Sequence, residues 1–303
     1  RAYGELSRQD DVAPEELNMA WRVLEGAVRD RKISEIPESK DLQRRLVELW
    51  GADNVRRYQD ALDHLSYMLE RDPDDADLQV LRATYLVRSG SLDEAVKYSY
   101  KLVGYDPDTD EFDAKQATAP DAAQVYMNLA VILRTRHGKP DLADRVMDQL
   151  VDVNPKSAEA YLARGQFHDM TNEADEARLD IEKAYQLQPE NADVLLAAGT
   201  LETKEKNYDK ASEYLAAGKK LHPKDPRFYQ SMADVMIKQE RYDDALAQVD
   251  EGLKNIQGQR GNVLMLFKAD LQLHAGKLDD FKRTVEDMTR AGFRTEWIEW
   301  YEA

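Results

Sequence analysis

A ladder of residues with a fixed period of 34 positions runs through most of this chain of 303 residues. Alanines mark it at Ala61, Ala95, Ala143, Ala177, Ala211 and Ala245, and prolines mark it at Pro73, Pro107, Pro155, Pro189 and Pro223. Each ladder advances by 34 residues except at one shared step of 48. Two unrelated residue types that keep one register, including its irregular step, predict a tandem array of equivalent structural units rather than a single globular core.

Each unit of the array is expected to be a pair of antiparallel helices. A third ladder of small residues lies twelve positions before the alanines, at Ala83, Gly165, Gly199 and Ala233. Small residues on facing helices allow the helix axes to approach closely, so we expect these residues and the ladder alanines to be buried where helices cross. A proline past the second helix stops it, and turn residues such as Asn207 separate the two helices. From Ala76 to Lys254 we therefore expect helix pairs and no β-sheet.

This pattern resembles the tetratricopeptide repeat family. The family has a bulky residue early in its first helix, a small residue four positions later, and small residues and a proline in its second helix; Tyr161, Gly165, Ala177 and Pro189 match them here. The resemblance covers residues 54–296. Over this range the chain is similar to segments of bacterial proteins with several such repeats. It implies an all-α, right-handed superhelical solenoid of antiparallel helix pairs, in which the first helices (A helices) line a concave face and the second helices (B helices) lie outside.

The ladders predict five segments along the chain. Residues 1–40 are expected to hold a helix from Pro14 to about Arg31 and a linker, residues 41–107 a divergent and then a regular repeat, residues 108–121 an acidic inserted loop, residues 122–257 regular repeats, and residues 258–303 a divergent repeat and the start of another from Thr295 to Tyr301. The inserted loop accounts for the step of 48, because it adds 14 residues to the usual 34.

The composition argues against several classes of function. Acidic residues outnumber basic ones by 59 to 42, and a net charge of −17 repels nucleic acid phosphates. No apolar run approaches the roughly 18 residues that span a bilayer, so we expect no direct membrane insertion. The chain has no cysteine, which excludes disulfides and thiolate metal sites. Its compartment stays open, since such chains occur both in the cytoplasm and among exported proteins.

No residues in the sequence form a recognisable catalytic or cofactor-binding motif. The five histidines lack zinc spacing. Four aspartates, Asp106, Asp108, Asp110 and Asp113, resemble part of a calcium loop, but Glu111 stands where that loop needs glycine and Ala117 where it needs glutamate. We therefore expect neither an enzyme nor a cofactor or metal site, and we interpret the aspartates as a solvated loop.

The resemblance implies a partner-binding site on the concave face. By register its residues are Met127, Val131, Arg134, Leu162, Gln166, Asp169, Leu196, Thr200, Thr203, Gln230, Asp234 and Ile237. This mixture of apolar and polar side chains suits a protein or peptide partner, and Asp169 and Asp234 favour a basic one. Some family members grip the C-terminal carboxylate of chaperones, but only Arg227 is basic at the matching positions, so that activity is not expected.

We therefore expect a non-catalytic scaffold or adaptor that binds a protein or peptide segment on its concave face. Two alternatives remain open. The chain is a regulatory or substrate-recruiting arm of a larger enzyme or assembly machine, or it is a structural arm that self-assembles through the open ends of the array.

Overall fold

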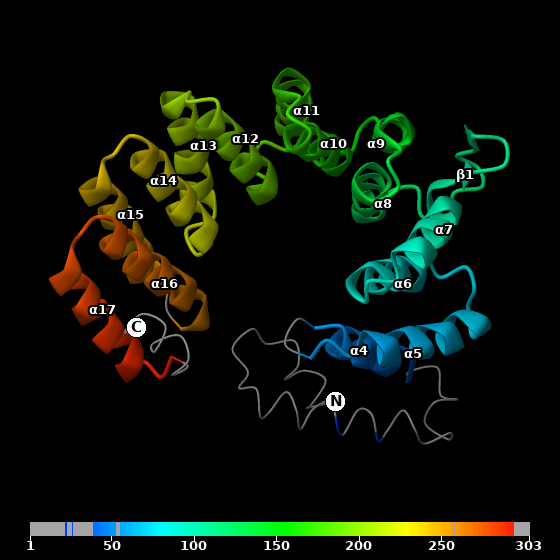
Figure 1. The fold of residues 1–303 in the computed structure, drawn as a ribbon, viewed down its shortest axis with the longest axis horizontal. Helices are drawn as coiled ribbons and strands as arrows, with labels where there is room; N and C mark the ends of the chain where they lie inside the picture. Colours follow the sequence, from blue (N-terminus) through cyan, green and yellow to red (C-terminus); the bar gives the residue numbers. More distant parts are fainter. Residues whose placement is uncertain (1–21, 23–25, 27–38, 53–54, 257, 294–303) are drawn as a thin grey trace. The chain divides into compact units, whose positions relative to one another are not determined.

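The structure is a computed structural model that describes residues 22, 26, 39–52, 55–256 and 258–293. The chain forms two compact units, residues 1–167 and 168–303. Each unit is a succession of antiparallel helix pairs in chain order (Figure 1). The expected all-α fold class is therefore confirmed. The helices predicted from Pro14 to Arg31 and from Thr295 to Tyr301 lie outside the described residues, apart from Arg22 and Gly26.

The even-numbered helices are the A helices and the odd-numbered helices are the B helices. In the first unit they are α4 (Ser39–Trp50), α5 (Tyr58–Arg71), α6 (Ala76–Arg88), α7 (Leu92–Val103), α8 (Ala123–Thr135) and α9 (Pro140–Val153). Helix α10 (Ala158–Met170) contains the boundary between the units. The second unit continues with α11 (Ala174–Leu187), α12 (Ala192–Lys204), α13 (Tyr208–Leu221), α14 (Pro226–Lys238), α15 (Tyr242–Asn255), α16 (Gln259–His274) and α17 (Leu278–Arg290).

Small residues hold the paired helices at close range, as the sequence predicts. Ala177 and Ala211 are completely buried, and Gly165 and Gly199 are buried as well. A Cβ atom added to Gly199 would lie 2.6 Å from Cγ of Leu215 on the facing helix α13. Real Cβ atoms do not approach other atoms so closely, so the crossing of α12 and α13 depends on the absence of a side chain at this position.

The turn between the two helices of each pair uses one recurrent backbone geometry. In the second unit a residue with positive φ stands at the same place in four successive turns, at Asn172, Lys206, Glu240 and Gly276. The next residue donates its backbone N–H to a carbonyl five positions earlier, as Arg241 does to Met236 at 2.9 Å. This is a Schellman turn, which satisfies carbonyls at the helix end that would otherwise lack partners. These turn residues therefore give a reliable register from one pair to the next.

Contacts between successive A helices give the second unit an inner side. Helix α12 contacts α14, and α14 contacts α16. The described B helices α11, α13, α15 and α17 make no comparable contact with one another. An array whose A helices lie closer together than its B helices must curve with the A helices inside. We call the solvent-facing side of α12, α14 and α16 the inner face.

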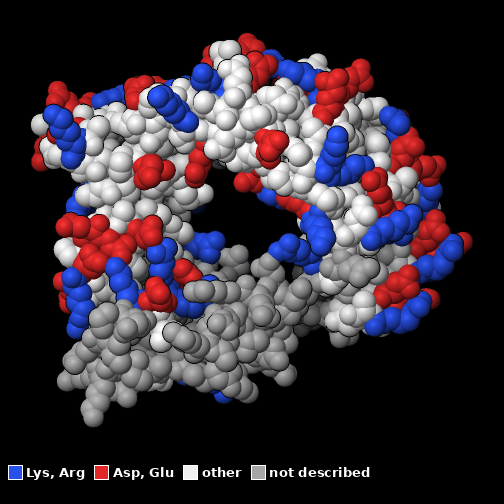
Figure 2. Space-filling view, turned by 180° about the vertical axis from the view of Figure 1, so that it is seen from behind, with Lys and Arg blue, Asp and Glu red and all other residues white. Residues whose placement is uncertain are grey.

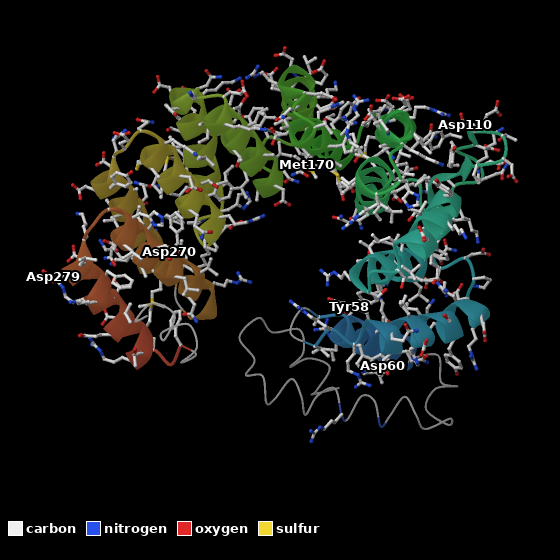
Figure 3. All side chains as sticks on the ribbon, viewed as in Figure 1. Tyr58, Asp60, Asp110, Met170, Asp270 and Asp279 are labelled. Carbon is white, nitrogen blue, oxygen red and sulfur yellow. The ribbon has the colours of Figure 1, made fainter. Side chains whose placement is uncertain are left out.

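The expectation of no β-sheet from Ala76 to Lys254 is wrong in one place. Residues Tyr105–Asp106 (β1) and Glu111–Phe112 (β2) pair as an antiparallel hairpin within the first unit. The hairpin lies where the sequence predicts an acidic loop, with Asp110 at its tip (Figure 3). The insertion therefore has a regular structure of its own.

Glycine and arginine contacts explain why this insertion is ordered. Helix α7 ends at Gly104, whose φ of +72° reverses the chain and whose carbonyl accepts the N–H of Asp113 at 2.8 Å. A side chain at Gly104 would collide with the backbone of Asp113. On the other side, Arg145 of α9 donates to the backbone and side-chain oxygens of Asp110 at 2.6 and 2.9 Å. The contact of Arg145 with Asp110 joins residues 35 positions apart, so local composition gave no sign of it.

The close crossing at Gly199 predicts a large cost for a bulky side chain. Gly199→Leu should lower the free energy of unfolding by about 1–3 kcal/mol, because Leu215 and its neighbours must move to admit the new side chain. Urea unfolding followed by circular dichroism measures this cost. Ala216→Leu, on the exposed side of α13, is the matched control and should change stability little. Equal stability of Gly199→Leu and the parent would show that this helix register is wrong.

The left-handed turn at Glu240 predicts a stabilising substitution. Glu240 has a φ of +60° and is exposed. Glycine adopts this conformation without the steric cost that a Cβ atom incurs, so Glu240→Gly should raise the free energy of unfolding by about 0.5–1 kcal/mol. Glu213→Gly, in the exposed interior of α13, should instead lower it by about 1 kcal/mol. A loss of stability in both variants would contradict the proposed turn geometry.

Candidate functional site

Three residues at matching positions form a row across the inner face of the second unit. Thr200, Asp234 and Asp270 each precede the left-handed turn residue of their pair by six positions, on α12, α14 and α16 respectively. Figure 3 labels Asp270 on α16. Thr200 and Asp234 are exposed, and Asp270 is half-buried. We call this set the central row.

Apolar side chains lie beside the central row, accompanied on one side by the polar Gln230. One helical turn towards the C-terminus are Ile237 and Leu273, and Leu273 is 42% exposed. One turn towards the N-terminus are Leu196 and Gln230, both half-buried. Residues three and four apart are neighbours on one helix face, so these groups adjoin the row directly. The inner face thus offers carboxylates flanked by accessible hydrocarbon.

Asp234 is the carboxylate of this face that lacks a neutralising partner. It forms no hydrogen bond or ion pair within the described part of the chain. Burial among the surrounding helices raises the pKa of its carboxyl above the ordinary value, and the charge of Lys238 opposes this only in part. A cation placed beside Asp234 would stabilise its ionised carboxylate, which burial disfavours.

Other predicted charges near this face are already paired. Asp169 accepts a hydrogen bond from Lys204 at 2.6 Å, so its charge is compensated. Arg227 binds Asp193 at 2.7 Å and also Asp225, its own helix cap. Asp169 is therefore less suited than Asp234 to bind a basic partner, because Lys204 already neutralises it. Arg227 is likewise not available as an isolated cation for a partner's carboxylate.

The remaining predicted residues lie in several environments. Met127 and Val131 are half-buried against the core of the first unit, and Arg134 binds Asp144 at 2.8 Å. Leu162, which the sequence predicts as an apolar anchor, is only 8% exposed. Gln166 is exposed, while the hydroxyl of Thr203 donates to the carbonyl of Gly199 at 2.7 Å. The second unit therefore holds the most accessible part of the predicted surface.

Sequence reasoning missed Asp270 and Leu273. They belong to the last pair, in which the period lengthens from 34 to 36 residues between Glu240 and Gly276. The added residues extend α16, which has 16 residues whereas α14 has 13. Gly276 in the turn after α16 and Phe281, 36 positions after Ala245, both give the register of this pair, so the rule used for the earlier pairs would have found the two residues.

A separate polar groove lies at the turns of the second unit. It has a volume of about 630 Å³, and its lining includes Arg178, Glu202, Asn207 and Lys210. Glu202 is 2% exposed. Its carboxylate accepts from Lys210 and Asn207, each at 2.8 Å, and lies 3.5 Å from the guanidinium of Arg178. The groove is therefore built around a fully partnered structural charge, which distinguishes it from the inner face.

The partners of Glu202 decide its protonation. Burial acts to raise the pKa of its carboxyl, but the hydrogen bonds from Lys210 and Asn207 and the nearby positive charges outweigh burial. The net result is a pKa below the ordinary value. The folded state consequently favours the ionised form of this side chain.

Charge on the outside of the molecule is of both signs. On the face seen in Figure 2, acidic and basic side chains are interspersed. Within the described residues, no group of three or more histidine, aspartate or glutamate side chains is arranged to hold a metal ion. None of the described helices combines the length and the apolar character that crossing a membrane requires.

Comparison with known sequences identifies repeats along the chain. One family model described as "Tetratricopeptide repeat" matches residues 46–108 and 135–192. A second family model with the same description matches residues 172–235. Together these matches cover more than half of the chain. No significant match to a curated protein sequence was found.

Solved structures with similar folds include repeat proteins from bacteria and yeast. A tetratricopeptide repeat protein from Parabacteroides merdae superposes with a TM-score of 0.52 at 15% identity, over 92% of this chain and 97% of that chain. The pilF protein of Pseudomonas aeruginosa gives 0.49 at 20% identity, over 77% and 98%. Yeast Tom70 gives 0.49 at 14% identity, over 95% and 84%. At such identities the first likeness shows the fold alone.

The buried Glu202 predicts a specific pH dependence of stability. Because its folded pKa lies below its unfolded value, its contribution is complete above the unfolded pKa of about 4.3 and disappears as the pH falls through the folded pKa. Glu202→Gln should lower the free energy of unfolding by about 1.5–3 kcal/mol at neutral pH, and this difference should shrink below about pH 4. Urea titrations across this range measure it. The exposed Glu213→Gln should show no such trend, and a constant difference for Glu202→Gln would refute the assignment.

Proposed function

Because the chain belongs to the tetratricopeptide repeat family, we propose that it is a non-catalytic scaffold that binds a segment of another protein on the inner face. One observation carries this proposal. Three successive A helices present side chains at matching positions, and these side chains combine accessible hydrocarbon with polar groups. A surface of this kind can anchor an extended segment or a helix by burying apolar side chains within a polar rim.

The residues of the inner face have few structural duties of their own. Thr200 is exposed, and Leu273 leaves 42% of its surface in water although leucine is usually buried. On the face seen in Figure 2, acidic and basic side chains are interspersed, which favours solvation over docking there. These features support the inner face as the place where a partner would bury the most apolar surface.

The test is a binding titration with a protein partner that the immobilised chain captures and mass spectrometry identifies. The double variant Thr200→Glu/Leu273→Glu places two carboxylates on the inner face at exposed positions, so the fold should survive. A partner that covers them must remove both from water, and affinity should fall at least about tenfold. Leu162→Glu is unsuitable for this purpose, because it would bury a charge inside the helix pair.

The matched control is Leu179→Glu/Ala216→Glu, which adds the same two charges to exposed positions of the B helices α11 and α13. This control should bind like the parent. Circular dichroism and thermal melting establish that both double variants are folded. If the control loses affinity and the inner-face variant does not, the partner binds the outer side and the proposal fails.

A further inference from the structure

We infer that the step between the B helices α13 and α15 is a hinge of the second unit, which the side chain of Lys219 holds closed. This inference concerns how the array bends, and it does not rest on the proposed function. It follows from the contacts that join successive B helices at one matching position, and from the way in which α13 and α15 both pack on α14.

Two tyrosines join the preceding B helices, α11 and α13. The rings of Tyr185 on α11 and Tyr214 on α13 meet edge to face, with their centroids 5.2 Å apart. Both rings also pack against the apolar cluster that α12, α13 and α14 share. An ion pair of 3.3 Å between Lys210 and Glu182 adds to this contact. Because salt does not screen an aromatic contact, we expect the spacing of α11 and α13 to be fixed.

The contact at the next step is polar. Lys219 and Gln248 stand 34 positions after Tyr185 and Tyr214, so they occupy the places of the two tyrosines. Nζ of Lys219 on α13 donates to Oε1 of Gln248 at 2.9 Å and to Oε2 of Glu251 at 2.8 Å, both on α15. Within the described part of the chain, every hydrogen bond and ion pair that connects α13 directly with α15 uses Lys219. A single cation therefore replaces the aromatic pair.

Both B helices also pack closely on α14, the A helix between them. A Cβ atom added to Gly218 of α13 would lie 1.9 Å from Cε1 of Phe228, and one added to Gly252 of α15 would lie 2.8 Å from Cγ of Tyr229. Phe228 and Tyr229 are adjacent in α14, so they point in directions about 100° apart and receive the two B helices on different sides. A small rotation about α14 can therefore change the distance between α13 and α15 while each helix keeps its glycine contact.

Lys219 is suited to a contact that opens reversibly. Its side chain is 21% exposed, and that of Glu251 is 44% exposed. Ion pairs with such access to water contribute little stability, and added salt weakens them. Nζ of Lys219 also lies 5.6 Å from the ring centre of Tyr229, so the cation keeps a second favourable site when it leaves Glu251. Salt, or the loss of the lysine charge, should therefore open this step.

The experiment compares the two steps by distance measurements in the full chain. The chain has no cysteine, so introduced cysteines can be spin-labelled at chosen positions. Leu179, Glu213 and Ala247 are exposed and stand 34 positions apart on α11, α13 and α15. Double electron–electron resonance on Leu179→Cys/Glu213→Cys measures the tyrosine step, and the same measurement on Glu213→Cys/Ala247→Cys measures the lysine step.

Salt should change only the lysine step. At about 1 M salt, charges are screened beyond roughly 3 Å. Compared with low salt, the distance between positions 213 and 247 should lengthen by a few ångströms and its distribution should broaden. The distance between positions 179 and 213 should stay the same, because Tyr185 and Tyr214 hold it.

Variants of Lys219 test whether this residue is the clamp. Lys219→Met removes the charge and keeps an unbranched side chain, so it should give the open distance already at low salt. Lys220→Met is the matched control, because Lys220 is exposed and has no hydrogen bond or ion pair with the described residues; it should behave like the parent. Lys219→Tyr/Gln248→Tyr rebuilds the aromatic pair and should make the lysine step insensitive to salt. Thermal melting confirms that each variant is folded.

Two outcomes would overturn the inference. If salt lengthens both steps equally, screening acts on the whole array and not on Lys219. If Lys219→Met and Lys220→Met both keep the distance of the parent, the lysine does not hold the step closed. Should Lys219→Met fail to fold, the comparison of the two steps at low and high salt still decides the question, because it leaves Lys219 in place.

Discussion

The close approach of two helices at a small residue is the contact on which the rest of the molecule depends. At the crossing of α12 and α13, Gly199 lies directly against Leu215. Helices held at this distance leave no room for one helix of the pair to slide along the other, and the Schellman turns recur at the same place in each pair. That register, in turn, aligns Thr200, Asp234 and Asp270 on successive A helices. The surface that we propose for partner binding is therefore a consequence of the packing inside the pairs.

The sequence predicted the fold well because each repeat encodes the same local solution several times. Alanine, glycine and proline ladders are steric requirements of a helix pair, and steric requirements can be seen one residue at a time. The hairpin from Tyr105 to Phe112 was missed, because an interaction that orders it joins Asp110 to Arg145, 35 positions further along the chain. Contacts between distant residues leave no periodic trace in composition.

The candidate site could be predicted only in part, for a related reason. Register indicates which residues share a face, but it does not indicate which of them have partners. Asp169 and Asp234 are indistinguishable in the sequence, yet Lys204, which lies 35 positions further along, neutralises Asp169, and no described residue neutralises Asp234. Burial depends likewise on tertiary packing, and Leu162 is only 8% exposed. The exact roles of such residues are decided by tertiary contacts.

The places where the repeat changes length are also instructive. The hairpin after α7 and the added residues at the start of α16 both occur where a B helix passes to the next A helix. Extra residues at these junctions leave the crossing inside each pair, and the alignment of the A helices, unchanged. The array is thereby insulated against insertions. New structure can accumulate at one edge during evolution while the proposed binding surface keeps its geometry.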